Sequence, residues 1–299
     1  MATAMINGVN LYYEVTGEGF PLVLSHEFMG TSKSWEPQVK FFSRRYQVIT
    51  YNHRGFPPSE VPEKPALYSQ ELLIEDLHEL LCHLGIKQAY IGGLSMGGNV
   101  ALNFGIAHPK MAKALIVAAT GAGSTDQEQF MAEAEQVAQL FETEGVKVVA
   151  DLLTKKTPRV QFLHKDPRGW QEFYDDFLTH SAIGSAYTLR GVQIKRPAVY
   201  ALESKLQQLK LPTLIMVGDE DDASIEPAIF MKRNISYSGL VVFHQSGHAI
   251  NLEEPDLFNW VMLDFLTSVE AGRWAAHEPQ RERRTVFGTL VDLSSQKKE

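Results

Sequence analysis

The sequence predicts an α/β fold with a mostly parallel central sheet and helices on both faces. Short apolar segments alternate with amphipathic helical segments along residues 21–119, a pattern typical of parallel sheets that are covered on both sides. The alternation then stops and resumes at Pro212. This interruption predicts a helical insertion between two parts of one α/β core.

The first part of the core contains the clearest local signals. Asn7-Gly8 is a tight-turn dipeptide between alternating apolar residues, and it predicts a hairpin over residues 5–14. Ser69 is a suitable N-cap for an amphipathic helix that runs to Gly85. Proline in His108-Pro109 ends the next helix, because proline cannot continue one. The other expected elements are strands at residues 21–25, 46–51, 89–93 and 114–119, and a helix at residues 35–42.

The rest of the chain divides into a helical stretch and the end of the core. Residues 124–206 show several helical patterns and no convincing strand, so we expect a helical cap, or lid, there. Strands are expected again at residues 212–218 and 240–243, followed by a closing helix at residues 257–269. The predicted boundaries are 1–123 and 207–272 for the core, 124–206 for the cap and 273–299 for a C-terminal tail.

The composition is that of an ordinary globular protein, with 299 residues of which 44% are hydrophobic. The net charge of −8 argues against nucleic acid as a partner, and the short basic cluster 281–284 is expected to be a solvated patch. No signal-peptide pattern and no membrane-length apolar run occur, so a cytoplasmic protein without a membrane partner is expected. Cys82 is the only cysteine, and its leucine neighbours predict a buried, unreactive thiol.

The segment of residues 91–98 carries the strongest chemical signal, because it holds G-x-S-x-G with Ser95 at its centre. A strand-like run precedes this motif and a helix-like run follows it. A serine on such a sharp turn adopts strained backbone geometry that only small neighbours permit. The turn sets the hydroxyl at a helix N-terminus, where backbone N–H groups stabilise negative charge. We therefore expect Ser95 to be a nucleophile.

A serine hydroxyl is a weak nucleophile that needs a base and a third group to orient that base. His248 lies on a loop between the last predicted strand and the closing helix, and we expect it to be the base. The acid should follow the strand at residues 212–218, where four acidic residues, 219–222, are adjacent. Asp221 is the preferred candidate, and Asp126, after the preceding strand, is the alternative.

An oxyanion hole requires two backbone N–H groups that point at the developing negative charge. Met96, directly after the nucleophile, is expected to supply one, and Phe28, in the loop after the first core strand, is expected to supply the other. His26 and Glu27 in this loop do not predict a metal site, because no H-E-x-x-H motif, cysteine partner or suitably spaced second histidine accompanies them. Neither a metal nor a cofactor is expected.

Taken together, these segments resemble the alpha/beta-hydrolase superfamily over residues 8–272. Residues 22–119 look most like bacterial 3-oxoadipate enol-lactonases and related small esterases. The resemblance implies an alpha/beta-hydrolase fold with a helical cap, and a catalytic triad in the chain order serine, acid, histidine. The segments that carry it are residues 26–30, 51–59, 93–98, 218–221 and 247–248.

The activity that this resemblance implies is hydrolysis of a small carboxylic ester or lactone through an acyl-enzyme on Ser95. Serine at this position argues against haloalkane dehalogenase and epoxide hydrolase chemistry, which similar families run through a carboxylate nucleophile. Two alternatives stay open: cleavage of a C–C bond in a diketone-like substrate, and a slow-turnover ligand receptor of the same fold. The oligomeric state is not readable from the sequence.

Two places depart from the family pattern. Glu27 stands where family members often have glycine, so its side chain either turns away from the oxyanion hole or contacts substrate or water. Asn52 and Pro57 replace the usual aspartate and glycine, and we expect both to be structural. Cap aromatics are explained equally well by packing between cap helices. The residues expected to line the substrate pocket are Glu27, Met29, Trp35, Trp170, Phe173, Tyr174 and Phe177.

Overall fold

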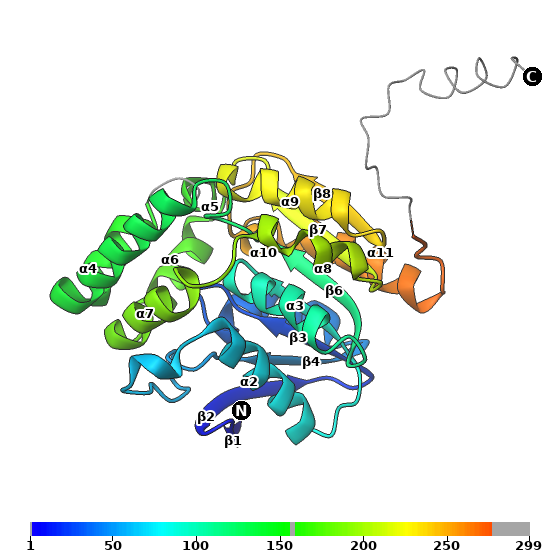
Figure 1. Cartoon of the computed structure of the whole chain (residues 1–299), viewed down its shortest axis with the longest axis horizontal. Helices are drawn as coiled ribbons and strands as arrows, with labels where there is room; N and C mark the ends of the chain where they lie inside the picture. Colours follow the sequence, from blue (N-terminus) through cyan, green and yellow to red (C-terminus); the bar gives the residue numbers. More distant parts are fainter. Residues whose placement is uncertain (1, 156–158, 277–299) are drawn as a thin grey trace, which may run out of the picture.

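The computed structural model describes residues 2–155 and 159–276, which form an eight-stranded sheet flanked by helices (Figure 1). The strand order is β1-β2-β4-β3-β5-β6-β7-β8. The β1–β2 hairpin joins the sheet antiparallel, and the six strands from β4 to β8 in this order run parallel. The strands are β1 (Ala2–Ile6), β2 (Val9–Thr16), β3 (Phe20–Ser25), β4 (Tyr46–Tyr51), β5 (Ala89–Leu94), β6 (Ala112–Ala118), β7 (Thr213–Gly218) and β8 (Ser238–Phe243).

The helices confirm the predicted α/β class and its alternation of elements. Ser69 caps α2 as expected, because its hydroxyl accepts a hydrogen bond from the backbone N–H of Leu72. The helices are α1 (Glu36–Phe42), α2 (Gln70–His83), α3 (Met96–Ala107), α4 (Gln127–Leu153), α5 (Val160–Lys165), α6 (Pro167–Phe177), α7 (Ala182–Thr188), α8 (Glu203–Gln208), α9 (Asp222–Asn234), α10 (Ile250–Glu253) and α11 (Pro255–Glu270).

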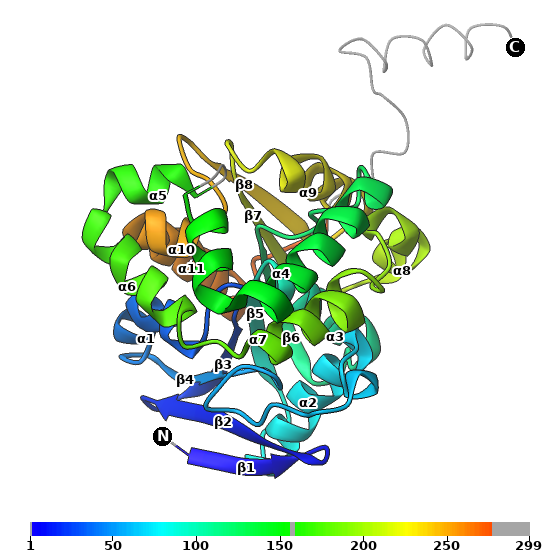
Figure 2. The same cartoon turned by 90° about the vertical axis from the view of Figure 1, so that its left-hand side faces the viewer.

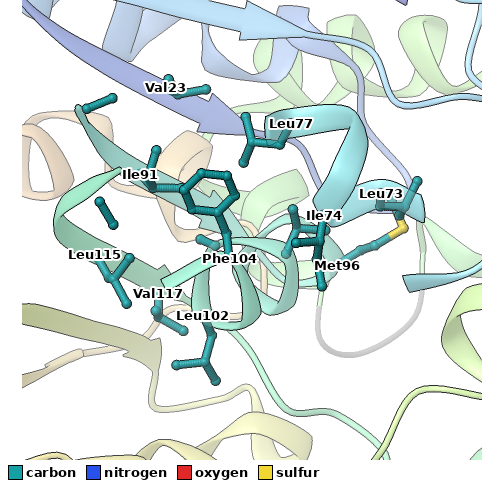
Figure 3. Close-up of a cluster of buried hydrophobic side chains, with 14 of the residues drawn as sticks. Val23, Leu73, Ile74, Leu77, Ile91, Met96, Leu102, Phe104, Leu115 and Val117 are labelled. Atoms are coloured by element: carbon teal, nitrogen blue, oxygen red, sulfur yellow. The ribbon is translucent and has the colours of Figure 1, made fainter. Parts of the chain in front are cut away.

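Two apolar layers hold the helices on the sheet. On one face, α2, α3 and α9 pack against the strands, and Figure 3 shows Phe104 of α3 between Ile91 of β5 and residues of α2. On the other face, α1 and α11 bury Phe42 and Phe258 against the sheet. Every residue of β5 and β7 is buried, as a strand covered on both faces requires.

Helices α4 to α8 lie between β6 and β7 in the chain, where the sequence predicts the cap. We keep the name cap for residues 124–206, the boundaries proposed from the sequence. Figure 2 shows α4 and α7 in front of the strands, and a separate apolar cluster joins the cap helices to one another. The long helix α4 changes direction at Gly145, which has a φ of 81° that glycine adopts readily.

A buried ion pair fastens the loop after β4 to α2. Arg54 donates from Nε and Nη2 to the carboxylate of Asp76 at 2.6 and 2.5 Å, and both side chains are 1% exposed. Arg54 also donates to the backbone carbonyls of Leu67 and Asn7. These bonds connect the β1–β2 turn, the loop after β4 and α2.

Asp76→Ala is expected to lower the free energy of unfolding by about 3–5 kcal/mol, because it leaves the Arg54 guanidinium buried without its counter-charge. Urea denaturation measures the change. Glu79→Ala is the control, since Glu79 lies on the exposed face of the same helix and its loss should cost less than about 0.5 kcal/mol. Equal losses for the two variants would contradict the importance of the buried pair.

Two expectations need correction. Cys82 is exposed rather than buried. Leu80 and Leu81 are the last residues of the buried apolar face of α2, whereas the Cys82 thiol lies on the solvent-facing side of the helix, near His78. The chain stays packed on the core past the predicted boundary at residue 272: Trp274 packs on Phe265 with ring centroids 4.7 Å apart.

The basic cluster at residues 281–284 lies outside the described residues. Over residues 2–155 and 159–276, no helix is both long and apolar enough to cross a membrane.

Candidate active site

The turn between β5 and α3 places Ser95 at the carboxyl edge of the sheet. Ser95 has φ 55° and ψ −111°, a strained conformation for a residue with a side chain. A Cβ atom on Gly93 would lie 2.2 Å from the backbone of Gly97, and one on Gly97 would lie 2.0 Å from the carbonyl oxygen of Ser25. Glycine is therefore required on both sides of Ser95, as the motif predicts.

His248 and Asp221 meet because they follow β8 and β7, which are adjacent parallel strands. His248 Nδ1 lies 2.7 Å from Asp221 Oδ2, and the side chains are 9% and 1% exposed. The carboxylate only accepts hydrogen bonds, so Nδ1 carries the proton and Nε2 is left as a proton acceptor. The carboxylate of Glu253 also accepts from the backbone N–H groups of Gly247 and Ala249, which fixes the loop on both sides of the imidazole.

The electrostatic environment raises the pKa of His248 above its usual range. Burial alone would lower this pKa, but the charge of Asp221 and its hydrogen bond to Nδ1 stabilise the imidazolium and outweigh that effect. Arg159 lowers the pKa and Glu27 raises it by smaller amounts. Asp221 therefore stabilises the protonated form of His248, which is the form that results when the histidine acts as a base.

The neighbouring acidic residues have other partners. Asp219 Oδ1 accepts a hydrogen bond from the backbone N–H of Ser246 at 3.1 Å. Asp126, the alternative acid, caps α4 by accepting from the N–H of Gln129 at 3.0 Å. Among the candidate acids, Asp221 is the one that is bonded to His248, so the alternative at Asp126 is not supported.

Ser95 and His248 line the same cavity, which has a volume of about 240 Å³. No hydrogen bond joins their side chains in this structure.

Of the two residues predicted for the oxyanion hole, Phe28 also lines the cavity, and Met96 is the first residue of α3. Within the described residues, neither the Phe28 nor the Met96 N–H donates a hydrogen bond. A larger cavity of about 860 Å³ lies between α1, α6 and the start of α11, and neither Ser95 nor His248 lines it.

Glu27, the unusual residue of the oxyanion loop, forms a buried ion pair with the cap. Arg159, just before α5, donates from Nη1 to Oε1 at 3.2 Å and from Nη2 to Oε2. The side chains of Glu27 and Arg159 are 1% and 7% exposed. The guanidinium also lies over the ring of Phe173, 5.4 Å from its centroid. The cap thus supplies the charge that neutralises Glu27 beside the candidate oxyanion hole.

Asn52 and Pro57, the other two residues that differ from the family pattern, make structural contacts. Asn52 is buried, its Oδ1 accepts from the N–H of Ser32 at 2.9 Å, and its Nδ2 donates to the carbonyl of Pro57 at 2.7 Å. Asn52 therefore ties the loop after β4 to the loop after β3, the segment that contains Phe28.

His26 is occupied by hydrogen bonds on both ring nitrogens. Its Nε2 accepts from the backbone N–H of His53 at 3.0 Å, and its Nδ1 then donates to the carbonyl of Glu27 at 2.7 Å. Burial lowers the pKa of His26 to about 4, so the ring is neutral at neutral pH. In the described part of the chain, two groups of potential metal ligands occur, both on the surface around α2: Glu75, His78 and His108; and His78, Glu79 and Cys82.

The structure corrects most of the predicted pocket. Glu27 and Met29 line the cavity that contains Ser95. Trp35 instead packs against Phe258 on the far layer of the core, with ring centroids 6.0 Å apart. Within the cap, Trp170 stacks on Tyr174 with ring centroids 5.4 Å apart. The four cap aromatics join the apolar cluster of the cap and do not line this cavity: Trp170, Phe173, Tyr174 and Phe177.

Among the cavity-lining residues that were not predicted are two arginines, Arg159 and Arg196. Both come from the cap and lie in segments without a recognisable motif. Pro197, directly after Arg196, predicts that the helical pattern ends there, but it does not predict which way the arginine side chain points.

Comparison with known proteins agrees with the observed fold. A model of the alpha/beta hydrolase fold family matches residues 21–255. The chain is 29% identical to 3-oxoadipate enol-lactonase 1 of Acinetobacter baylyi, over 88% of this chain and 95% of that protein. Among solved structures, it is similar to an enol-lactonase from Burkholderia xenovorans LB400, with a TM-score of 0.78 and 26% identity over 89% of this chain and 100% of the other. A thermophilic esterase from Thermogutta terrifontis gives a TM-score of 0.81 and 27% identity, over 90% and 98% of the two chains.

Proposed function

The chain belongs to the alpha/beta hydrolase fold family, and from this premise we propose that it hydrolyses a carboxylic ester or lactone with a triad of Ser95, His248 and Asp221. The observation that carries the proposal is one arrangement: Asp221 is bonded to Nδ1 of a histidine that shares a cavity with a serine on a strained turn. The similarity to enol-lactonases and to an esterase supports an ester or lactone as the bond that is cleaved.

The proposed reaction has two halves, the formation of an acyl-enzyme and its hydrolysis. Ser95 Oγ attacks the carbonyl carbon while His248 Nε2 takes its proton, and Asp221 stabilises the resulting imidazolium. The N–H groups of Phe28 and Met96 bind the oxyanion. Collapse of this intermediate breaks the C–O bond, and His248 returns the proton to the leaving alkoxide, which stays attached to the acyl chain when the substrate is a lactone. A water molecule, deprotonated by His248, then attacks the acyl-enzyme, and His248 gives this proton to Ser95 Oγ as the acid is released.

Comparing bond types tests the proposed reaction. The purified protein is assayed with a γ-lactone, a short aryl ester and a dienone that can be cleaved only at a C–C bond. We expect sustained hydrolysis of the lactone or the ester and no cleavage of the dienone. Cleavage of the dienone alone would contradict the proposal, as would a burst of about one product per protein without a steady rate.

Arg159→Met is expected to lower kcat by about 10²-fold, because it leaves the Glu27 carboxylate buried and unpaired beside the forming oxyanion. The unpaired charge should also raise the pKa of His248, so the acidic limb of the rate profile moves to higher pH. Kinetics over a range of pH measure both effects.

The double variant Glu27→Gln/Arg159→Met removes both charges, and it should recover most of the lost kcat and the original acidic limb. If the two residues acted independently of each other, their losses would add in the double variant. That additive result would contradict the electrostatic account of Arg159.

A further inference from the structure

Two buried arginines line the cavity that contains Ser95, and they differ in their counter-charges. Arg159 is neutralised by Glu27. Arg196, which is also 7% exposed, forms no ion pair with any described residue. Glu133 is the other carboxylate on the cavity wall, but it is exposed and accepts a hydrogen bond from Gln129 of its own helix. Among the described residues that line the cavity, Arg196 is therefore a buried positive charge without a counter-charge.

The neutral contacts of Arg196 fix its guanidinium and leave part of it free. Nε donates to Oε1 of Gln193 at 2.9 Å, and Nη2 donates to the carbonyl of Ala122 at 2.5 Å. The ring of Phe130 lies 5.4 Å from the guanidinium carbon. Within the described residues, no group accepts a hydrogen bond from Nη1. These contacts hold the plane of the guanidinium in place, and Arg196 lines the cavity with its Nη1 unbonded by any described residue.

A buried charge without a partner is costly, and a side chain held in this state normally binds an opposite charge. Burial lowers the pKa of Arg196 to about 10, so the group is still positively charged at neutral pH. A guanidinium matches the planar geometry of a carboxylate and binds it by charge-assisted hydrogen bonds. Since Ser95 and His248 line the same cavity of about 240 Å³, one small molecule can reach Arg196 and the reacting serine together.

We propose that Arg196 binds a free carboxylate on the substrate, so that the preferred ester or lactone carries one negative charge besides the bond that is cleaved. This inference rests on the proposed function, because it concerns the other end of the molecule that Ser95 attacks. Arg196 acts as a specificity determinant: it selects the charged substrate and takes no part in proton transfer.

Matched pairs of substrates test the proposal. The first pair is para-acetoxybenzoate and para-acetoxybenzamide, which carry the group on the alcohol side. The second is γ-carboxy-γ-butyrolactone and its carboxamide, which have the size of a small lactone. For the wild type we expect kcat/KM to be at least about 10-fold higher for the carboxylate of one pair, the usual effect of a hydrogen bond to a charged group.

Arg196→Gln should abolish this preference, with a loss of about 10- to 100-fold for the carboxylate and little change for the carboxamide. Arg196→Lys keeps the positive charge and should keep part of the preference. Arg168→Gln is the matched control: it also removes one cap arginine, but this side chain is 90% exposed and pairs with Glu172 on its own helix. We expect it to retain the wild-type ratio.

The possible failures can be told apart. If the wild type hydrolyses carboxylate and carboxamide equally in both pairs, the role of Arg196 is wrong, and the proposed hydrolase function stands. The role of Arg196 is also wrong if Arg196→Gln slows the hydrolysis of the carboxylate and of the carboxamide by the same factor. If the wild type hydrolyses none of the four compounds or other esters, the proposed function itself fails. Equal wild-type rates in both pairs would overturn the proposal even if Arg196→Gln does not fold, and a partial preference in Arg196→Lys would support it.

Discussion

Ser95→Ala is expected to lower kcat/KM for ester or lactone hydrolysis by at least about 10⁴-fold, because the described residues that line the cavity include no other serine, threonine or cysteine to form the acyl-enzyme. The variant should fold normally. Position 95 already holds a residue with a Cβ atom at φ 55°, so alanine introduces no new backbone strain. Initial rates with a short aryl ester, together with thermal unfolding of the same sample, separate loss of chemistry from loss of structure.

Ser43→Ala is a suitable control, since Ser43 lies just after α1 and outside the cavity that contains Ser95. We expect its rate to stay within about twofold of the wild type, as for most substitutions away from a site. A folded Ser95→Ala protein that retains more than a few per cent of the wild-type rate would contradict the assignment of the nucleophile.

Asp221→Asn is expected to lower kcat by about 10⁴-fold, because the amide no longer stabilises the imidazolium and its N–H₂ group favours the wrong tautomer of His248. The pH dependence should change in a defined direction. In the wild type, the rate falls as the pH drops through the raised pKa of His248, since the imidazolium cannot accept the serine proton. Without the carboxylate this pKa decreases, so the acidic limb of the residual activity should move to lower pH.

Asp219→Asn is the matched control for this result. Asp219 follows the same strand, but it accepts a hydrogen bond from Ser246 and does not contact His248. The asparagine side chain also has an oxygen that can accept this bond, so kcat and the acidic limb should remain close to those of the wild type. A larger loss for Asp219→Asn than for Asp221→Asn would show that the acid has been assigned to the wrong residue.

The framework of the site could be predicted from the sequence because parallel strands bring their carboxyl ends to one edge. Ser95, Asp221 and His248 each follow a strand, and β5, β7 and β8 belong to the same parallel sheet. Knowing the order of elements was therefore enough to expect them near one another. Glycines at 93 and 97 gave a second, local signal, because the turn at Ser95 has no room for larger side chains.

The wall of the cavity could not be predicted in this way, because packing between cap helices decides it. Aromatic residues at helical spacing, such as Trp170 and Phe177, indicate that a helix has an apolar face but not what covers that face. Glu27 and Arg159 are 132 positions apart, and no periodicity relates them. Cys82 shows the same limit on a smaller scale, since neighbouring leucines do not determine which side of α2 a residue faces.

The central claim is that Ser95 is activated by His248, and covalent labelling tests it most directly. The protein is treated with an alkyl fluorophosphonate, its intact mass is measured, and the modified peptide is identified by fragmentation. The account predicts one adduct per chain, located on Ser95, absent from Ser95→Ala and formed much more slowly in His248→Ala. An unlabelled wild-type protein, or an adduct that forms equally fast in Ser95→Ala, would contradict it.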